Sequence, residues 1–234
     1  INNKNMIRID TIYQRVLAIL NKENRGYMTP QEFNLLANQA QLDIFEQYFY
    51  DLSQFNRAGE INNEYANIIK NIKEKIDIFR VSDYSLTYSI DFDLPSDLYR
   101  LSTVTYNEFT EIEATQKNEL IYIVNSPLTK PTTSFPIFLR SGNTIKVYPT
   151  SIVSNVSCSY IKKPKSINWT YIEVNGTPLY NSTATDHQNC ELHDSEEVNL
   201  VNKILTYAGI AIKSPDVYQA AEAKENKKIT QEKS

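Results

Sequence analysis

Residues 29–52 read TPQEFNLLANQAQLDIFEQYFYDL and form the most clearly patterned stretch of the chain. Thr29 and Glu32 have the spacing of a capping box, and Pro30 stands at the first helical position. Apolar side chains then recur at helical spacing from Phe33 to Leu52, in a stripe wide enough to be covered on more than one side. The stretch therefore predicts a long, largely buried helix.

Shorter helical patterns lie on both sides of this stretch. Residues 11–22, with Asp10 as N-cap, and residues 62–79 each carry one apolar face. Together these helices predict an N-terminal helical block over residues 1–83.

The helical pattern returns near the other end of the chain. Residues 195–209 predict a helix with Asp194 as N-cap and Gly209 as terminator. A last helix is expected from Ser214, and it becomes wholly polar after its alanines. Residues 193–234 are therefore predicted to complete the helical domain. Their polar end is expected either to be ordered by a partner or to form a disordered tail.

The middle of the chain, residues 84–192, has a different pattern. Alternating β-branched and aromatic residues begin near Ser82, and prolines separate the runs. Residues 175–192 read as a long polar loop. The fold class predicted is α+β: an α-helical bundle with an inserted antiparallel β-sandwich or barrel domain and an extended C-terminal helix. The expected strands are residues 84–92, 98–106, 109–115, 119–124, 136–140, 144–149, 154–162 and 169–174.

Composition argues against several classes of protein. Five glycines leave no Gly-rich phosphate loop, and a net charge of −4 without a basic region argues against a nucleic-acid grip. Two cysteines are too few for a disulfide framework, so both are expected to be reduced. The start of the chain lacks a signal-peptide pattern, and no apolar run is long enough to span a membrane.

Residues 186–194 offer the best case for a metal. His187, Cys190 and His193 recur every three residues, but a structural zinc site needs four ligands, and no second pair is present. A polar loop that leads into a helix is the favoured interpretation, with His193 contacting backbone near the helix start. No metal or cofactor is predicted, and neither histidine is expected to be catalytic.

Acidic pairs give the best case for an enzyme. Asp91 and Asp93, or Glu111 and Glu113, have the same-face spacing of a strand, which glycosidases use for paired carboxylates. A solvated sheet face is the favoured interpretation, and no catalytic residue is predicted.

A set of short motifs is spread, in order, over most of the chain. They are Asp10-Thr11-Ile12-Tyr13-Gln14-Arg15-Val16, Thr29-Pro30-Gln31-Glu32-Phe33-Asn34, Gln39-Ala40-Gln41, Leu94-Pro95-Ser96-Asp97-Leu98-Tyr99-Arg100, Val147-Tyr148-Pro149, Tyr160-Ile161-Lys162-Lys163-Pro164, Glu191-Leu192-His193, Glu196-Glu197 and Leu205-Thr206-Tyr207-Ala208-Gly209-Ile210. Together the motifs resemble structural proteins of short-tailed bacteriophages, in particular the head-to-tail connectors of the crAss-like phage group. This family is also called the tail adaptor, gatekeeper or tail tubular protein A-like family.

The resemblance implies a non-enzymatic virion protein at the portal vertex, assembled in the host bacterial cytoplasm. Twelve copies would form a ring that contacts the portal protein and the next tail ring or tail-hub protein, and genomic DNA would pass through it. The C-terminal segment would reach the portal. The implied portal-interface candidates are Ile210, Ile212, Pro215, Val217, Tyr218 and Ala221.

Two other functions remain open at this stage. One is a different tail component, such as a tail-tube or receptor-binding module, which would bind cell-surface glycan rather than portal. The other is a tail-associated glycan hydrolase that uses one of the acidic pairs. The sequence offers no convergent catalytic motif for this second function.

Overall fold

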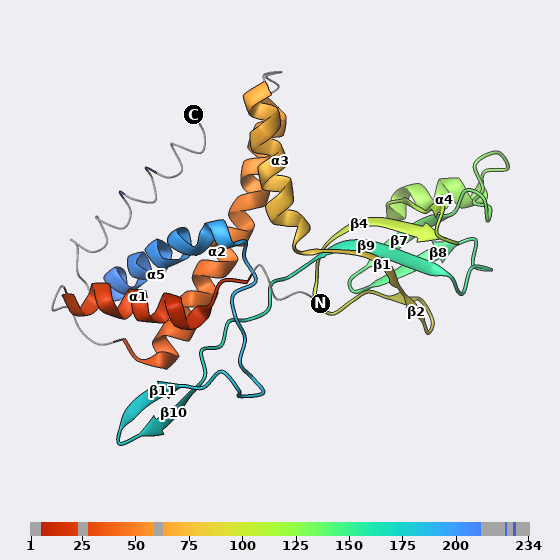
Figure 1. Ribbon diagram of the computed structural model, residues 1–234. Coiled ribbons are helices and arrows are strands. Elements are labelled where there is room, and N and C mark those ends of the chain that lie inside the picture. Colours follow the sequence, from red (N-terminus) through yellow and green to blue (C-terminus); the bar gives the residue numbers. More distant parts are fainter. Residues whose placement is uncertain (1–5, 23–27, 59–62, 212–222, 224–226, 228–234) are drawn as a thin grey trace. The chain divides into compact units, whose positions relative to one another are not determined.

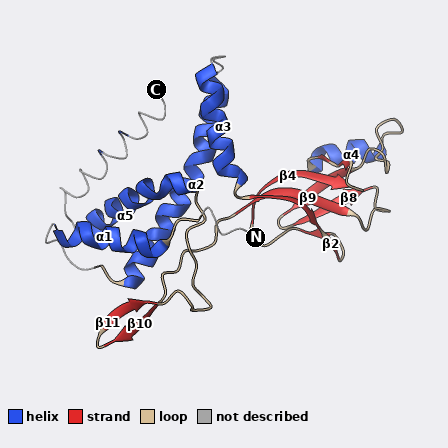
Figure 2. Ribbon diagram, viewed as in Figure 1, coloured by secondary structure: helices blue, strands red, loops and turns tan. Residues whose placement is uncertain are grey.

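The computed structural model describes residues 6–22, 28–58 and 63–211, together with residues 223 and 227. These residues form both helices and sheets, which confirms the α+β class (Figures 1 and 2). They fall into two compact units. The helical unit comprises residues up to 78 and from 164 onward, and the β unit comprises residues 79–163.

The helical unit contains α1 (Ile9–Lys22), α2 (Pro30–Ala58), α3 (Asn63–Asp77) and α5 (Glu197–Ala211), with a 3-10 turn (Asp194–Glu196) before α5. Helix α2 packs against α3 and α5, and α1 packs against α5. Both ends of the chain therefore contribute to one core. Its fully buried members include Ile12, Val16, Phe33, Ala37, Ala40, Ile44, Leu200 and Ile204.

The predicted helix starts are confirmed in one place and wrong in two. Thr29 and Glu32 form the expected capping box: the Thr29 amide donates to Glu32 Oε2 at 2.9 Å, and the Glu32 amide donates to Thr29 Oγ1 at 3.3 Å. Asp10 lies inside α1 rather than before it. Asp194 is also inside its turn, because the side chain of His193 accepts from the Ser195 amide and caps it.

The predicted helix ends differ by a few residues. Helix α2 continues past Leu52 to Ala58, and α5 continues past Gly209 to Ala211. Gly209 is buried inside α5, so it does not terminate the helix.

The β unit contains two open sheets. The strand orders are β1-β9-β4-β5 and β2-β3-β8-β7-β6, and no closed barrel forms among the described strands. All pairs are antiparallel except β6 with β7. The strands are β1 (Arg80–Ser85), β2 (Thr87–Tyr88), β3 (Phe92–Asp93), β4 (Leu98–Tyr106), β5 (Thr110–Glu111), β6 (Glu113–Ala114), β7 (Ile137–Ser141), β8 (Thr144–Tyr148) and β9 (Val156–Lys162).

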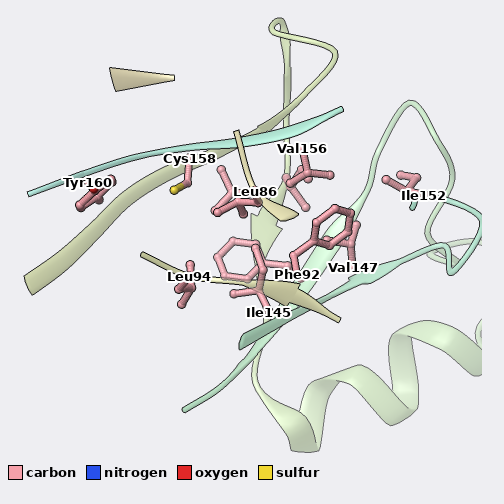
Figure 3. Packing of buried hydrophobic residues seen from close by; sticks show 12 residues of the cluster. Leu86, Phe92, Leu94, Ile145, Val147, Ile152, Val156, Cys158 and Tyr160 are labelled. Carbon is pink, nitrogen blue, oxygen red and sulfur yellow. The ribbon is translucent and has the colours of Figure 1, made fainter. Parts of the chain in front are cut away.

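One hydrophobic core serves both sheets (Figure 3). Val104, Cys158 and Tyr160 come from the first sheet, and Phe92 and Ile145 come from the second. Side chains on the facing sides of strands alternate with solvent-facing ones, so each sheet contributes every second residue.

Residues 119–124 are predicted as a strand, and this is wrong: they lie in α4 (Lys117–Asn125). Every residue from Leu120 to Val124 is apolar, so the stretch satisfies either periodicity. Leu120, Ile123 and Val124 are half-buried whereas Ile121 and Tyr122 are exposed, which is helical spacing. The predicted strand 109–115 is likewise divided into β5 and β6, which belong to different sheets.

Residues 164–192 belong to the helical unit, although the sequence places them in the β-rich domain. They include a two-stranded hairpin, β10 (Tyr171–Val174) and β11 (Thr177–Tyr180), where the sequence predicts one strand and a loop. Asn175 and Gly176 both have positive φ, at 52° and 75°. Asn-Gly is the strongest short-range signal for such a hairpin turn.

Candidate interaction surfaces

Three amide side chains on α2 hold the chain segment that returns from the β unit. We call Asn34, Asn38 and Gln41 the amide row. The Ile167 amide donates to Asn38 Oδ1 at 2.7 Å, and Asn38 Nδ2 donates to the Ile167 carbonyl at 2.9 Å. Asn34 makes the same pair of bonds with Trp169, at 2.8 and 3.2 Å. The row therefore satisfies extended backbone as a neighbouring strand would.

The spacing of the amide row has a geometric cause. Four helical residues rise about 6 Å, and two residues of an extended chain rise about 6.6 Å. Amides at positions 34 and 38 can thus reach alternate residues of an antiparallel strand, and Gln41 Nε2 continues the match by donating to the Lys165 carbonyl at 2.8 Å. The sequence pattern does not predict the row, because the apolar stripe beside it carries the stronger helical signal.

An aromatic cluster anchors the base of the hairpin. Trp169 is 2% exposed, stacks against Tyr171 and Tyr180 with ring centroids 5.8 Å apart, and contacts Tyr13 at 4.3 Å. Its Nε1 donates to Asp10 Oδ1 at 3.1 Å. Asp10, predicted as an N-cap, instead satisfies a buried indole.

The three residues considered as metal ligands, His187, Cys190 and His193, make separate contacts. His187 Nε2 lies 3.2 Å from the Tyr180 hydroxyl, and His193 Nδ1 accepts from the Ser195 amide at 3.2 Å. The contact of His193 with helix-start backbone is thereby confirmed. Cys190 is fully buried, and burial raises the pKa of its thiol to about 12. In the described part of the chain, no three His, Cys, Asp or Glu side chains are grouped to hold a metal ion.

The acidic pairs lie on the β unit. Glu111 is on β5 and Glu113 on β6, so they stand in different sheets, and both are exposed. Asp93 lies on β3 and Asp91 just precedes it. A better-buried carboxylate is Glu196, which accepts from Lys75 Nζ at 2.6 Å and ties α3 to the turn before α5. Lys75 and Glu196 carry no sequence signal that marks them as a pair.

The portal-interface candidates fall mostly outside the described residues. Ile212, Pro215, Val217, Tyr218 and Ala221 lie there, and Ile210 is described only as part of α5. Membrane spans are a separate question: no helix among the described residues has the length and apolarity to cross a bilayer.

Apolar side chains are exposed in both units, and two groups of them lie close together in sequence. We call residues 117–135, α4 and the loop after it, the flap; Ile121, Tyr122, Leu128 and Phe135 there are 60–93% exposed. The second group is on the hairpin, where Ile172, Val174 and Leu179 are 43–52% exposed. Such surfaces on a single chain mark sites of protein contact.

No protein-family model matches the chain, and a search of curated proteins finds no matching relative.

Proposed function

We propose that this protein is a structural subunit of a phage head-to-tail connector: a ring, of twelve copies by analogy, between the capsid portal and the tail. The observation that carries the proposal is the organisation of the chain. Its two ends build one helical unit, and the β unit is inserted between them in sequence. The resemblance to the connector family implies this arrangement for one protomer.

The finer architecture belongs to the same proposal. The helical unit would act as a bundle, the two sheets of the β unit as a sandwich, and the C-terminal segment as an extended helix on the portal. The shared core of the two sheets supports the sandwich. The exposed apolar side chains of both units support a protein that works in an assembly.

The polar side chains of the described region also fit a structural role. Asn34, Asn38 and Glu191 bind backbone amides, and His193 caps a turn. A non-enzymatic ring at the portal vertex, through which DNA passes, needs polar side chains only for structural hydrogen bonds of this kind. A net charge of −4 suits a channel that must not hold DNA tightly.

The test is assembly with the portal protein of the same phage. The full chain is mixed with purified portal and examined by mass photometry and cryo-EM. We expect a ring bound coaxially to the portal. A chain that stays monomeric and never binds portal contradicts the proposal, and binding to cell-surface glycan in its place would favour a receptor-binding module.

A further inference from the structure

The turn of the β10–β11 hairpin places an asparagine directly before a glycine. Asn175 and Gly176 are the two turn residues, both with positive φ, and Val174 and Thr177 form the last pair of the ladder. This Asn-Gly dipeptide occurs once in the chain. Asn175 and Gly176 are both exposed, and the Asn175 side chain makes no hydrogen bond with any described residue. Its amide group therefore faces solvent beside the backbone nitrogen of Gly176.

The surroundings of the turn are open. A Cβ placed on Gly176 would meet no atom within 4 Å, and the glycine itself has no side chain to shield its backbone nitrogen. Among the described strands, β10 and β11 pair only with each other. Two-stranded hairpins are marginally stable, so a turn at the tip of one opens more readily than a turn within a larger sheet.

We infer that Asn175 is a site of spontaneous modification, at which the side-chain amide is hydrolysed through a cyclic succinimide. When the turn opens, the Gly176 backbone nitrogen attacks Asn175 Cγ, and a new C–N bond closes the ring. The bond from Cγ to the side-chain nitrogen breaks, and that nitrogen leaves as ammonia, together with the proton of the Gly176 N–H. The reaction needs no oxidant or reductant, and it does not depend on the assembly that the protein forms.

Water then opens the succinimide in one of two ways. Its hydroxyl adds to one of the two ring carbonyl carbons, the bond from that carbon to the ring nitrogen breaks, and the remaining proton goes to the nitrogen. Opening at Cγ leaves an ordinary aspartate. Opening at the main-chain carbonyl of residue 175 leaves isoaspartate, in which the backbone runs through the side-chain methylene. Both products carry one more negative charge than the parent chain.

The two products affect the hairpin differently. Aspartate is accepted in the same turn, since Asp-Gly favours it as Asn-Gly does. Isoaspartate adds a methylene to the backbone between Val174 and Thr177, which no longer fits the two-residue turn of this register. The base of the hairpin stays in place, because Trp169 stacks against Tyr171 and Tyr180. The damage is therefore confined to the tip.

Incubation of the full chain at mildly alkaline pH, in water labelled with heavy oxygen, tests the inference. Each new carboxylate takes its oxygen from the labelled water, so mass spectrometry of the digested chain identifies the sites converted. The matched internal control is Asn143, which is exposed in the turn between β7 and β8 but is followed by Thr144. We expect Asn175 to be converted on the order of tenfold faster than Asn143, because glycine presents no side chain to the ring closure.

Two results would overturn the inference. One is a native chain that converts Asn175 no faster than Asn143; the same incubation in urea then shows whether the closed turn protects the site. The other is conversion of Asn175 to aspartate alone, since direct hydrolysis of the side chain gives no isoaspartate. Synthetic peptides containing each product provide the chromatographic standards.

Hydrogen exchange measures the effect on the hairpin. The amides of Val174 and Thr177 should lose their protection in the isoaspartate form and keep it in the Asn175→Asp variant, which has the added charge without the extra methylene. The Trp169 amide should be unchanged in both. Equal loss of protection in the two forms would contradict the effect of the methylene on the turn.

Discussion

At the scale of the residue, the amide row explains how one edge of an extended segment stays ordered without a neighbouring strand. The other edge of the segment pairs Asn168 with Gln188 in an isolated β-bridge. Buried backbone groups are costly when unpaired. At Ile167, which is 2% exposed, Asn38 supplies both partners through one side chain. The row thus replaces a strand with a helix face, and it fixes where the chain re-enters the helical unit.

Replacing Asn38 with alanine removes both bonds and leaves two backbone groups unpaired. We expect Asn38→Ala to lower the free energy of unfolding of the helical unit by about 2–4 kcal/mol. Urea denaturation followed by Trp169 fluorescence measures it. Gln39→Ala, one residue away and exposed, is the control and should cost no more than ~0.5 kcal/mol. Equal effects of the two substitutions would contradict the role of the row.

Asp10 provides a second test at this scale. Because its carboxylate accepts from Trp169 Nε1, Asp10→Ala should leave the indole unpaired and cost about 1–2 kcal/mol. In the background Trp169→Phe, which has no indole N–H, the same change should cost much less. Thermal unfolding of the four members of this double-mutant cycle gives the coupling. Additive costs would contradict the contact between Asp10 and Trp169.

At the scale of the element, the capping box of α2 has a measurable pH signature. Hydrogen bonds from Thr29 hold the pKa of the Glu32 carboxyl below its usual value of 4.5. A lowered folded-state pKa means that the stabilisation is present above the unfolded-state pKa and is lost as pH falls through the folded-state pKa.

We therefore expect Glu32→Gln to be less stable than the parent protein at neutral pH, with a difference that shrinks as the pH falls below 4.5. Thermal unfolding across a pH series provides the comparison. Thr29→Ala, which removes the other half of the box, should cost ~1 kcal/mol at neutral pH. A pH-independent difference for Glu32→Gln would rule out the carboxylate as the stabilising group.

Elements with a single strong signal were predictable from sequence, and elements with two compatible signals were not. The capping box located α2 because its polar pair and apolar stripe agree. Residues 120–124 are apolar throughout, so only tertiary contacts decide between helix and strand, and α4 was missed. The hairpin was not predicted for a different reason. Its Asn175-Gly176 turn is a hairpin signal, but it lies in a polar stretch whose composition favours a loop.

The candidate surfaces were less predictable than the fold. Sequence patterns identify residues that look apolar, but not which of them remain uncovered: Phe135 and Phe138 are three residues apart, and they are 80% and 7% exposed. Long-range pairs such as Lys75 with Glu196 are also invisible, because nothing local links them. The portal-interface candidates stay predictions.

At the scale of the whole molecule, each unit contains one of the two cysteines. Cys158 lies in the β unit and Cys190 in the helical unit, which also contains the single tryptophan. Burial raises the pKa of Cys158 to about 11 and that of Cys190 to about 12. Both thiols are therefore protonated and covered in the native protein, and they react only after their unit opens.

We expect alkylation of the two thiols to occur at different urea concentrations, with Cys190 following the change in Trp169 fluorescence. Each unit has its own core, so each should unfold as its own transition. Mass spectrometry of the alkylated peptides at each urea concentration distinguishes them. If Cys158 and Cys190 are alkylated at the same urea concentration, and the fluorescence of Trp169 changes there too, the protein unfolds in a single cooperative transition.

The insertion of the β unit has a consequence for synthesis on the ribosome. The Lys162 amide donates to the Phe79 carbonyl at 2.8 Å, so the entry and exit of the β unit meet. The core of the β unit is complete once Tyr160 has emerged, whereas α1 and α2 must wait for α5. We therefore expect the β unit to fold first during synthesis. Once folded, it holds its two ends together, so the helical unit closes a shorter effective loop. The insertion of the β unit between α2 and α5 therefore costs little chain entropy.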